Sequence, residues 1–441
     1  MIHWQPGFVY PPVFYPPHPP LDVLSAAIFA LVAAAVLFVT IRRPANGIAA
    51  LIVTVPFAYA HYAGGTSITI PKAAFAGFVL ALLWHRPSLR ELRDPRIRPF
   101  LLALAAMIGP MVLSFAFAQH RDAVAREVAK WIEYAVVFVG VCVAFSNDPD
   151  DRPIWGALVV TTGLVSVLAI AQEFIGATSG LFFYGQAIPR ISGPLEGPNQ
   201  LAAWLGLALP VLLARMLVHR SAPLVTVTAL AAIAETLTLS KSGVVAALVA
   251  CGLVVLLSRP SRVVRWRFAA GALALGSILI VLGAAVGFEA RFFSLKEVAQ
   301  PDHLATHPVL WKAALDLWRT SPLVGVGAGN YELDLAQVGL PDVHTHANSL
   351  YLQALAETGL AGFLAALYLV YASIATFARV ISRRPLIIGA LAASVGLALH
   401  QVFDYLVFYP KVGDFWWIIL AIGAVELINS REDARTIEVA A

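Results

Sequence analysis

Two histidines stand in a polar stretch that leads into an apolar helix. The stretch contains His344, His346 and Asn348. Histidine changes its charge near neutral pH, so either ring could take a proton from a reacting hydroxyl group as a general base. A structural histidine is the alternative for both, and more so for His344. A metal site is disfavoured, because no convincing set of further ligands accompanies the pair.

Two cationic residues occur in other short polar segments. Arg190 is the one basic residue of the Pro- and Gly-rich stretch 189–199, and Lys241 stands between two serines in the turn 239–243. A guanidinium group binds phosphate through two hydrogen bonds, whereas an ammonium group offers a point charge. Either residue could therefore bind a phosphate group. The alternatives are an interfacial arginine that contacts lipid head groups and an ordinary polar turn.

Three further ionisable residues fall at or near membrane depth. They are Glu235, His400 and Asp404. Such residues are costly in a bilayer and therefore suggest a functional role. His400 and Asp404 are four residues apart, so on a continuous helix they would share one face and could pair. A polar pair that stabilises the helix bundle is the simpler interpretation.

The composition sets these residues in a membrane protein. Of 441 residues, 59% are hydrophobic and 13% are charged. A soluble protein carries roughly 25% charged residues, so this chain has too few charges to cover a soluble surface. The net charge of +4 is interpreted as an orientation signal, and no nucleic-acid partner is expected. Cys142 and Cys251 both lie in apolar runs and do not suggest a disulfide framework or a zinc site.

The apolar runs predict an all-α polytopic membrane protein. A transmembrane helix needs about 20 apolar residues. On that basis we expect about 12–13 transmembrane helices in a single integral membrane domain over residues 1–441, the count depending on two short runs, 47–63 and 71–86. The predicted spans are 22–41, 47–63, 71–86, 98–118, 126–146, 153–175, 199–219, 222–239, 242–258, 268–288, 358–380, 386–407 and 412–429.

Basic residues predict how these helices are oriented. The loops 86–98 and 259–267 carry five and four arginines, and such loops favour the cytoplasm. Two long connections then face outward, away from the cytoplasm. One is 176–198, which contains Arg190. The other is the large loop 289–357, which carries the His motif and far exceeds the usual about 2–8 residues between helices. The search for a site therefore belongs on the periplasmic side.

Short helices are expected inside the large loop. Residues 308–318 repeat apolar side chains at helical spacing, which predicts an amphipathic helix that lies at the membrane surface or caps the bundle. Gly325, Gly327 and Gly329 follow. No βαβ unit surrounds these glycines, so a tight turn is preferred over a dinucleotide site.

The motifs and their order resemble the O-antigen ligase and O-antigen polymerase superfamily. The resemblance covers roughly residues 120–430. It rests on Arg190 to Asn199, the turn around Lys241, the run 322–330, and the motif from His346 through Glu357 to Gly359. It implies a multi-pass glycosyltransferase of the bacterial inner (cytoplasmic) membrane, surrounded by membrane lipids, with its active site on the periplasmic side and without a metal or other cofactor.

The resemblance also implies the substrates and the roles of residues. The donor is a glycan linked to undecaprenyl pyrophosphate. A ligase transfers it to lipid A–core or a similar lipid acceptor, and a polymerase transfers it to another lipid-linked glycan. By motif match Arg190 binds the pyrophosphate and His346 activates the acceptor, and Lys241 is a second pyrophosphate contact. Secondary candidates are Asn199, Asn348 and Glu357.

Two departures from the family pattern affect these roles. Lys241 stands where the family more often has arginine, and Ala347 separates His346 from the asparagine that usually follows the histidine. His344 is therefore a possible substitute for the base. Single displacement at the anomeric carbon would invert its configuration. The alternative of a different class is a polysaccharide-lipid transporter or flippase, which would need polar groups along a midplane pathway and often has inverted repeats.

Overall fold

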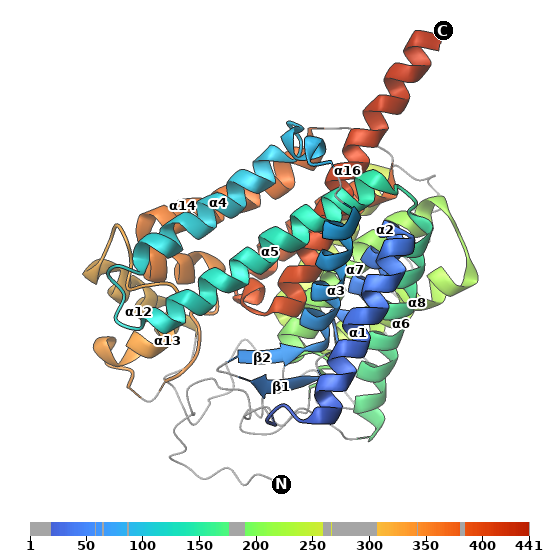
Figure 1. Cartoon of the computed structure of the whole chain (residues 1–441). Helices are drawn as coiled ribbons and strands as arrows, with labels where there is room; N and C mark the ends of the chain where they lie inside the picture. Colours follow the sequence, from blue (N-terminus) through green and yellow to red (C-terminus); the bar gives the residue numbers. More distant parts are fainter. Residues whose placement is uncertain are drawn as a thin grey trace.

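The protein is described by a computed structural model (Figure 1). The described residues are 19–57, 59–63, 66–85, 88–175, 190–258, 266, 307–341, 343–379 and 384–440, without the side chains of 63, 66 and 431–440. They form fourteen α-helices, short 3₁₀ helices and one two-stranded hairpin. The predicted span 268–288 and the first part of each long predicted loop lie outside the described residues.

The helices confirm an all-α polytopic membrane protein. Seven described helices are long and apolar enough to cross a membrane, and five shorter helices are also apolar. The long ones are α1 (Val23–Arg42), α5 (Arg121–Asn147), α6 (Arg152–Ile175), α7 (Pro198–Val218), α9 (Lys241–Ser258), α14 (Leu350–Ala378) and α16 (Pro410–Ala440). The shorter ones are α2 (Pro44–Thr54), α3 (Ile70–His85), α4 (Arg98–Ser114), α8 (Ala222–Leu237) and α15 (Pro385–His400).

Two predicted spans are wrong in their extent. The span predicted over 47–63 ends at Thr54, because Pro56 follows and cannot continue the backbone hydrogen bonds of a helix. The chain then forms an antiparallel hairpin of β1 (Ala60–Ala63) and β2 (Thr66–Thr69).

The span predicted over 386–407 ends at His400. The chain turns there and forms the 3₁₀ helix η4 (Leu406–Phe408), and Gln401 Oε1 accepts the Val407 N–H at 3.3 Å to hold the turn. Asp404 therefore lies in a connection between two helices. It does not share a helix face with His400, so the basis for pairing the two is lost.

The two ends of the helix bundle carry different segments of the chain. At one end Arg43 contacts Asp148 at 3.1 Å and Asp150 at 2.9 Å, and Arg384 contacts Glu426 at 2.7 Å. The hairpin and the short helices α12 (His307–Thr320) and α13 (Tyr331–Asp334) lie at the opposite end (Figure 1). Among the described residues, Arg43 and Arg384, which are predicted to be cytoplasmic, thus lie at one end of the bundle, and α12 and α13, from a segment predicted to be periplasmic, lie at the other (Figure 1).

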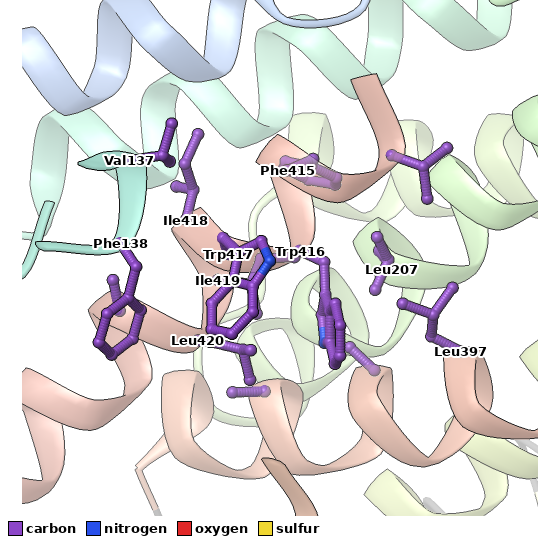
Figure 2. Packing of buried hydrophobic residues seen from close by; sticks show 14 of the residues in the cluster. Val137, Phe138, Leu207, Leu397, Phe415, Trp416, Trp417, Ile418, Ile419 and Leu420 are labelled. Carbon is purple, nitrogen blue, oxygen red and sulfur yellow. The ribbon is translucent and has the colours of Figure 1, made fainter. Parts of the chain in front are cut away.

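Helix α16 is the centre of the bundle. Of the residues in its most apolar stretch, 89% are buried inside the protein. The corresponding share for α1, at the edge of the bundle, is 22%. Trp417 of α16 meets Phe138 of α5 edge-on, with 5.5 Å between the ring centroids (Figure 2). Phe415 of α16 stacks on Trp204 of α7, with 4.5 Å between the ring centroids. Close packing of this kind, rather than apolar burial, holds helices together in lipid. The packing against α16 holds α5 and α7 in place, and polar residues lie at the ends of both helices.

The large loop forms a layer with its own core. The predicted amphipathic helix is confirmed as α12, which buries Leu310 and Leu317 against Tyr331 of α13. The 3₁₀ helix η3 (Leu335–Val338) and the start of α14 complete this layer. Helix α14 kinks at Gly359, where φ is 66° and ψ is −160°. Residues 350–358 therefore belong to the layer, and the longer part of α14 enters the bundle.

The glycine run forms the predicted tight turn. Gly325, Gly327 and Gly329 all have positive φ, at +69°, +117° and +71°. The Val326 N–H donates to Ala356 O at 3.0 Å, and the Gly327 N–H donates to Glu357 O at 2.8 Å. Only glycine lets the two backbones approach this closely. The turn thus fastens the loop layer to α14.

Replacing Gly325 by alanine should loosen this attachment. The new Cβ would lie 2.2 Å from the Glu357 carbonyl carbon, at a backbone φ that side chains disfavour. We expect Gly325→Ala to destabilise the protein by at least about 1–3 kcal/mol, measured as a lower midpoint of thermal unfolding in detergent. Gly156→Ala is the matched control, since nothing lies within 4 Å of its added Cβ. Equal midpoints for the two variants would contradict the packing described here.

Candidate functional site

Arg190 is fixed between two helix beginnings. Its side chain is buried, and Nε donates to Thr238 O at 2.8 Å while Nη2 donates to Asn199 Oδ1 at 2.8 Å. Asn199 is the second residue of α7, and Thr238 lies in the turn that leads into α9. The guanidinium group is therefore held where α7 and α9 both begin.

The beginnings of these helices favour an anion. Helix α7 starts with Pro198, which suits the first helical position. Helix α9 starts with the exposed Lys241, and Ser240 Oγ accepts the Gly243 N–H at 3.3 Å. The N-terminus of a helix carries partial positive charge and binds phosphate groups. Arg190 thus lies where two helix N-termini begin, and Lys241 is the first residue of one of these helices.

Asp404 connects this region to the loop layer. The Asn199 amide donates to Asp404 Oδ2 at 2.8 Å, and the Tyr405 N–H donates to Asp404 Oδ1 at 2.7 Å. The carboxylate is buried, and its turn is held by the Leu350 N–H, which faces Gln401 O at 3.0 Å and Asp404 O at 3.1 Å. Buried polar groups are costly unless they are hydrogen-bonded, and these contacts meet that requirement.

His346 lies on the other side of Asp404. Its Nε2 is 3.9 Å from Asp404 Oδ1 and 3.2 Å from Tyr409 Oη, and its Nδ1 accepts the Asn348 N–H at 3.2 Å. Asn348 has a φ of +48°, in the left-handed region that asparagine tolerates. Because Nδ1 accepts, the neutral ring carries its hydrogen on Nε2, facing Asp404 and Tyr409.

Aromatic rings surround the imidazole. The ring centroids of Tyr405, Phe408 and Tyr409 lie 6.1, 6.0 and 6.1 Å from that of His346. Burial lowers the pKa of His346 from its ordinary 6.5, and Asp404 opposes this only in part. The imidazole is therefore neutral near pH 7, the form that can accept a proton.

Glu357 supports the histidine loop from behind. Gln353 Oε1 accepts the Ala347 N–H at 2.7 Å, and Gln353 Nε2 donates to Glu357 Oε1 at 2.7 Å. The same carboxylate oxygen accepts the Tyr331 N–H at 3.4 Å. Glu357 thus contacts the backbone of the loop layer through Gln353 and Tyr331, and its position is that of a supporting residue.

Several of the residues singled out in the sequence meet at one place. Arg190, Asn199 and His346 are joined through Asp404, and Asn348 contributes its backbone amide. Among the residues the structure describes, no contact links His344 to this group, and its buried Nδ1 has no hydrogen-bond partner. Their chemical roles remain predictions.

Sequence reasoning missed Asp404 and Tyr409 as site residues. It paired Asp404 with His400, but His400 Nε2 is buried without a hydrogen-bond partner in the described part of the chain. Asp404 turns toward Asn199 and His346 instead. One signal could have found it: if the preceding helix ends at His400, Asp404 falls in a connection on the same side as the His motif.

Metal binding finds no support in the ranges described. Within them no group of three or more His, Cys, Asp or Glu side chains is arranged to hold a metal ion. The site contributes a single histidine and a single carboxylate, fewer than the three or four protein ligands of a typical zinc site. Arg190 and Lys241 remain the predicted contacts for an anion.

Removing the Asn199 amide should disconnect the two halves of the site. Asn199→Ala leaves Arg190 Nη2 and Asp404 Oδ2 without this partner. Loss of hydrogen bonds to buried charged groups costs about 1–3 kcal/mol or more, so the thermal unfolding midpoint should fall. The control is Asn147→Ala, whose amide contacts only the Val143 carbonyl of its own helix. A midpoint that falls no further than in the control would show that the bridge is not stabilising.

Comparison with known protein families gives a match over part of the chain. The family model described as O-antigen ligase matches residues 226–367. The matched segment contains Lys241, His344 and His346 and excludes Arg190 and Asp404. No curated protein matches the chain. The match covers about a third of the chain, so over this segment the protein is similar to the O-antigen ligase family.

Proposed function

We propose that the protein is an O-antigen ligase-type glycosyltransferase. It transfers a glycan from undecaprenyl pyrophosphate to a hydroxyl group of lipid A–core or a similar acceptor, at the periplasmic face of the bacterial inner membrane. The observation that carries the proposal is the series of contacts from Arg190 through Asn199 and Asp404 to His346. A group able to bind pyrophosphate and a group able to accept a proton are held in one rigid unit.

The pyrophosphate is the leaving group of this reaction. As the bond between the anomeric carbon and the phosphate oxygen breaks, negative charge grows on the pyrophosphate. Arg190 and Lys241, with the N-termini of α7 and α9, would stabilise that charge. Because these groups are held in place before the reaction, little reorganisation is needed when the charge develops.

The acceptor hydroxyl is the nucleophile. Its oxygen bonds to the anomeric carbon, its proton passes to His346, and the configuration inverts in a single displacement. For Nε2 to take the proton, the ring hydrogen must first move to Nδ1, which opens the Asn348 contact, and the acceptor must displace Tyr409 Oη. Asp404 then stabilises the imidazolium, as a carboxylate does in other proton-transfer sites.

Two alternatives are distinguished by their products. A polymerase would use the same donor groups and pass the glycan to a second lipid-linked glycan. A transporter or flippase would move the lipid-linked glycan without a covalent product. The polar contacts that support our proposal lie at one end of the bundle, near helix beginnings, whereas transporter sites lie near the bilayer midplane.

A transfer assay with variants tests the proposal. Purified protein in lipid nanodiscs is mixed with undecaprenyl-pyrophosphate glycan and, separately, with lipid A–core or a second lipid-linked glycan. We expect product on lipid A–core, and a loss of about 100-fold or more in His346→Ala and in Arg190→Ala. Lys312→Met is the control, since Lys312 is exposed on α12 and pairs only with Asp316. Wild-type transfer by His346→Ala would remove the base from the mechanism.

The pH dependence tests the role of the imidazole. Transfer needs neutral His346, so kcat/KM should rise with pH through the pKa of this residue, at a midpoint below 6.5 because burial lowers that pKa. Asp404→Asn removes a charge that favours the imidazolium, so the midpoint should move to still lower pH while the maximal rate falls. Asp316→Asn, on the exposed face of α12, should leave the midpoint in place. A midpoint that stays or rises in Asp404→Asn would contradict this role.

A further inference from the structure

A buried ion pair lies beside the site on α5. Lys130 and Glu127 are one turn apart, and each side chain is only 10% exposed. The Lys130 Nζ lies 2.8 Å from Glu127 Oε1 and 2.7 Å from Oε2. Removing two charges from water is costly even when they pair. The contacts that connect Arg190 to His346 do not involve Lys130 or Glu127. The site described above therefore does not explain why this ion pair is buried here.

Lys130 also reaches the connection between α15 and α16. Its Nζ donates to Phe408 O at 3.2 Å and lies 4.3 Å from the centroid of the Phe408 ring. Tyr134, on the same face of α5 one turn later, donates from Oη to Val407 O at 2.8 Å. Helix α5 thus holds two successive carbonyl groups of the segment 405–409.

The other side of the segment 405–409 faces the histidine. The Phe408 ring lies 6.0 Å from the His346 ring and 5.2 Å from the Tyr409 ring, and Tyr409 Oη meets His346 Nε2 at 3.2 Å. A single aromatic ring therefore lies in contact with the Lys130 ammonium group and with the imidazole. Movement of Phe408 would disturb both Tyr409 and His346.

We propose that Lys130 is a positioning residue for glycan transfer, which fixes the segment 405–409 against His346 and acts on the imidazole across the Phe408 ring. The inference rests on the proposed function, in which His346 is the base. Loss of Lys130 would release one of the two carbonyl contacts on α5. It would also remove a positive charge that adds to the effect of burial in favouring the neutral imidazole.

The charges around His346 predict the sign of that effect. Tyr405 and Tyr409 contact the ring and Asp404 lies 3.9 Å from it. The charges of His307 on α12 and Lys130 on α5 also act on the ring, and a side-chain hydrogen bond with Asn348 favours its charged form. Asp404 raises the pKa of His346, whereas His307 and Lys130 lower it, and burial lowers it most. Removing Lys130 should therefore raise the pKa of His346, opposite to the effect of removing the Asp404 charge.

Charge and packing are separated by two substitutions at Lys130. Lys130→Met keeps the length of the side chain and removes its charge, and Lys130→Arg keeps the charge. In the transfer assay we expect Lys130→Met to lower kcat severalfold and to move the acid limb of the pH profile to higher pH. Lys130→Arg should keep the wild-type limb. Arg126→Met is the matched control, because Arg126 is 57% exposed one turn earlier on α5.

Further measurements separate the possible failures. Binding of undecaprenyl-pyrophosphate glycan should be unchanged in Lys130→Met, because Arg190 and Lys241 are untouched. If the unpaired Glu127 prevents folding, the double variant Glu127→Gln/Lys130→Met provides a neutral pair of similar shape and should show the same direction of shift. A lower rate with an unmoved acid limb, or a wild-type rate and limb, would overturn the proposal. Absence of transfer by the wild type, or full transfer by His346→Ala, would overturn the proposed function instead.

Discussion

The hydrogen bond between Asn199 and Asp404 is the contact that makes one site out of two parts of the chain. Asn199 belongs to the beginning of α7 and holds Arg190 of the preceding segment, and His346 belongs to the loop layer. Asp404, in the turn between α15 and α16, accepts from the first part and faces the second. Since α7 and α16 pack through Trp204 and Phe415 in the core, the packing of the bundle places Asn199 beside the turn that contains Asp404.

The protonation of the imidazole is set by groups of opposite effect. Burial and Lys130 favour the neutral ring, and Asp404 favours the imidazolium. A base that must accept a proton and later release it needs both influences. The side chains of Phe408 and Tyr409 pack against the His346 imidazole, with ring centroids 6.0 and 6.1 Å from its own. The position of the segment 405–409 therefore influences the protonation of His346.

Much of the fold could be predicted from the sequence, because the length of an apolar run is a direct consequence of bilayer thickness. The amphipathic α12 and the glycine turn also follow from local patterns. Run length could not reveal that α2 ends at Thr54 and α15 at His400, since apolar residues continue beyond both points. Arg190 and His346 were found as motifs, but Asp404 gains its importance from contacts with residues far away in the chain. No local pattern carries that information.

The most direct measurement is a structure of the protein with a non-cleavable diphosphonate analogue of the lipid-linked donor. The account predicts that the diphosphonate lies against Arg190 and Lys241, with the anomeric carbon on the side of His346. A diphosphonate bound at the other end of the bundle, near Arg43 and Arg384, or an anomeric carbon out of reach of His346, would contradict it.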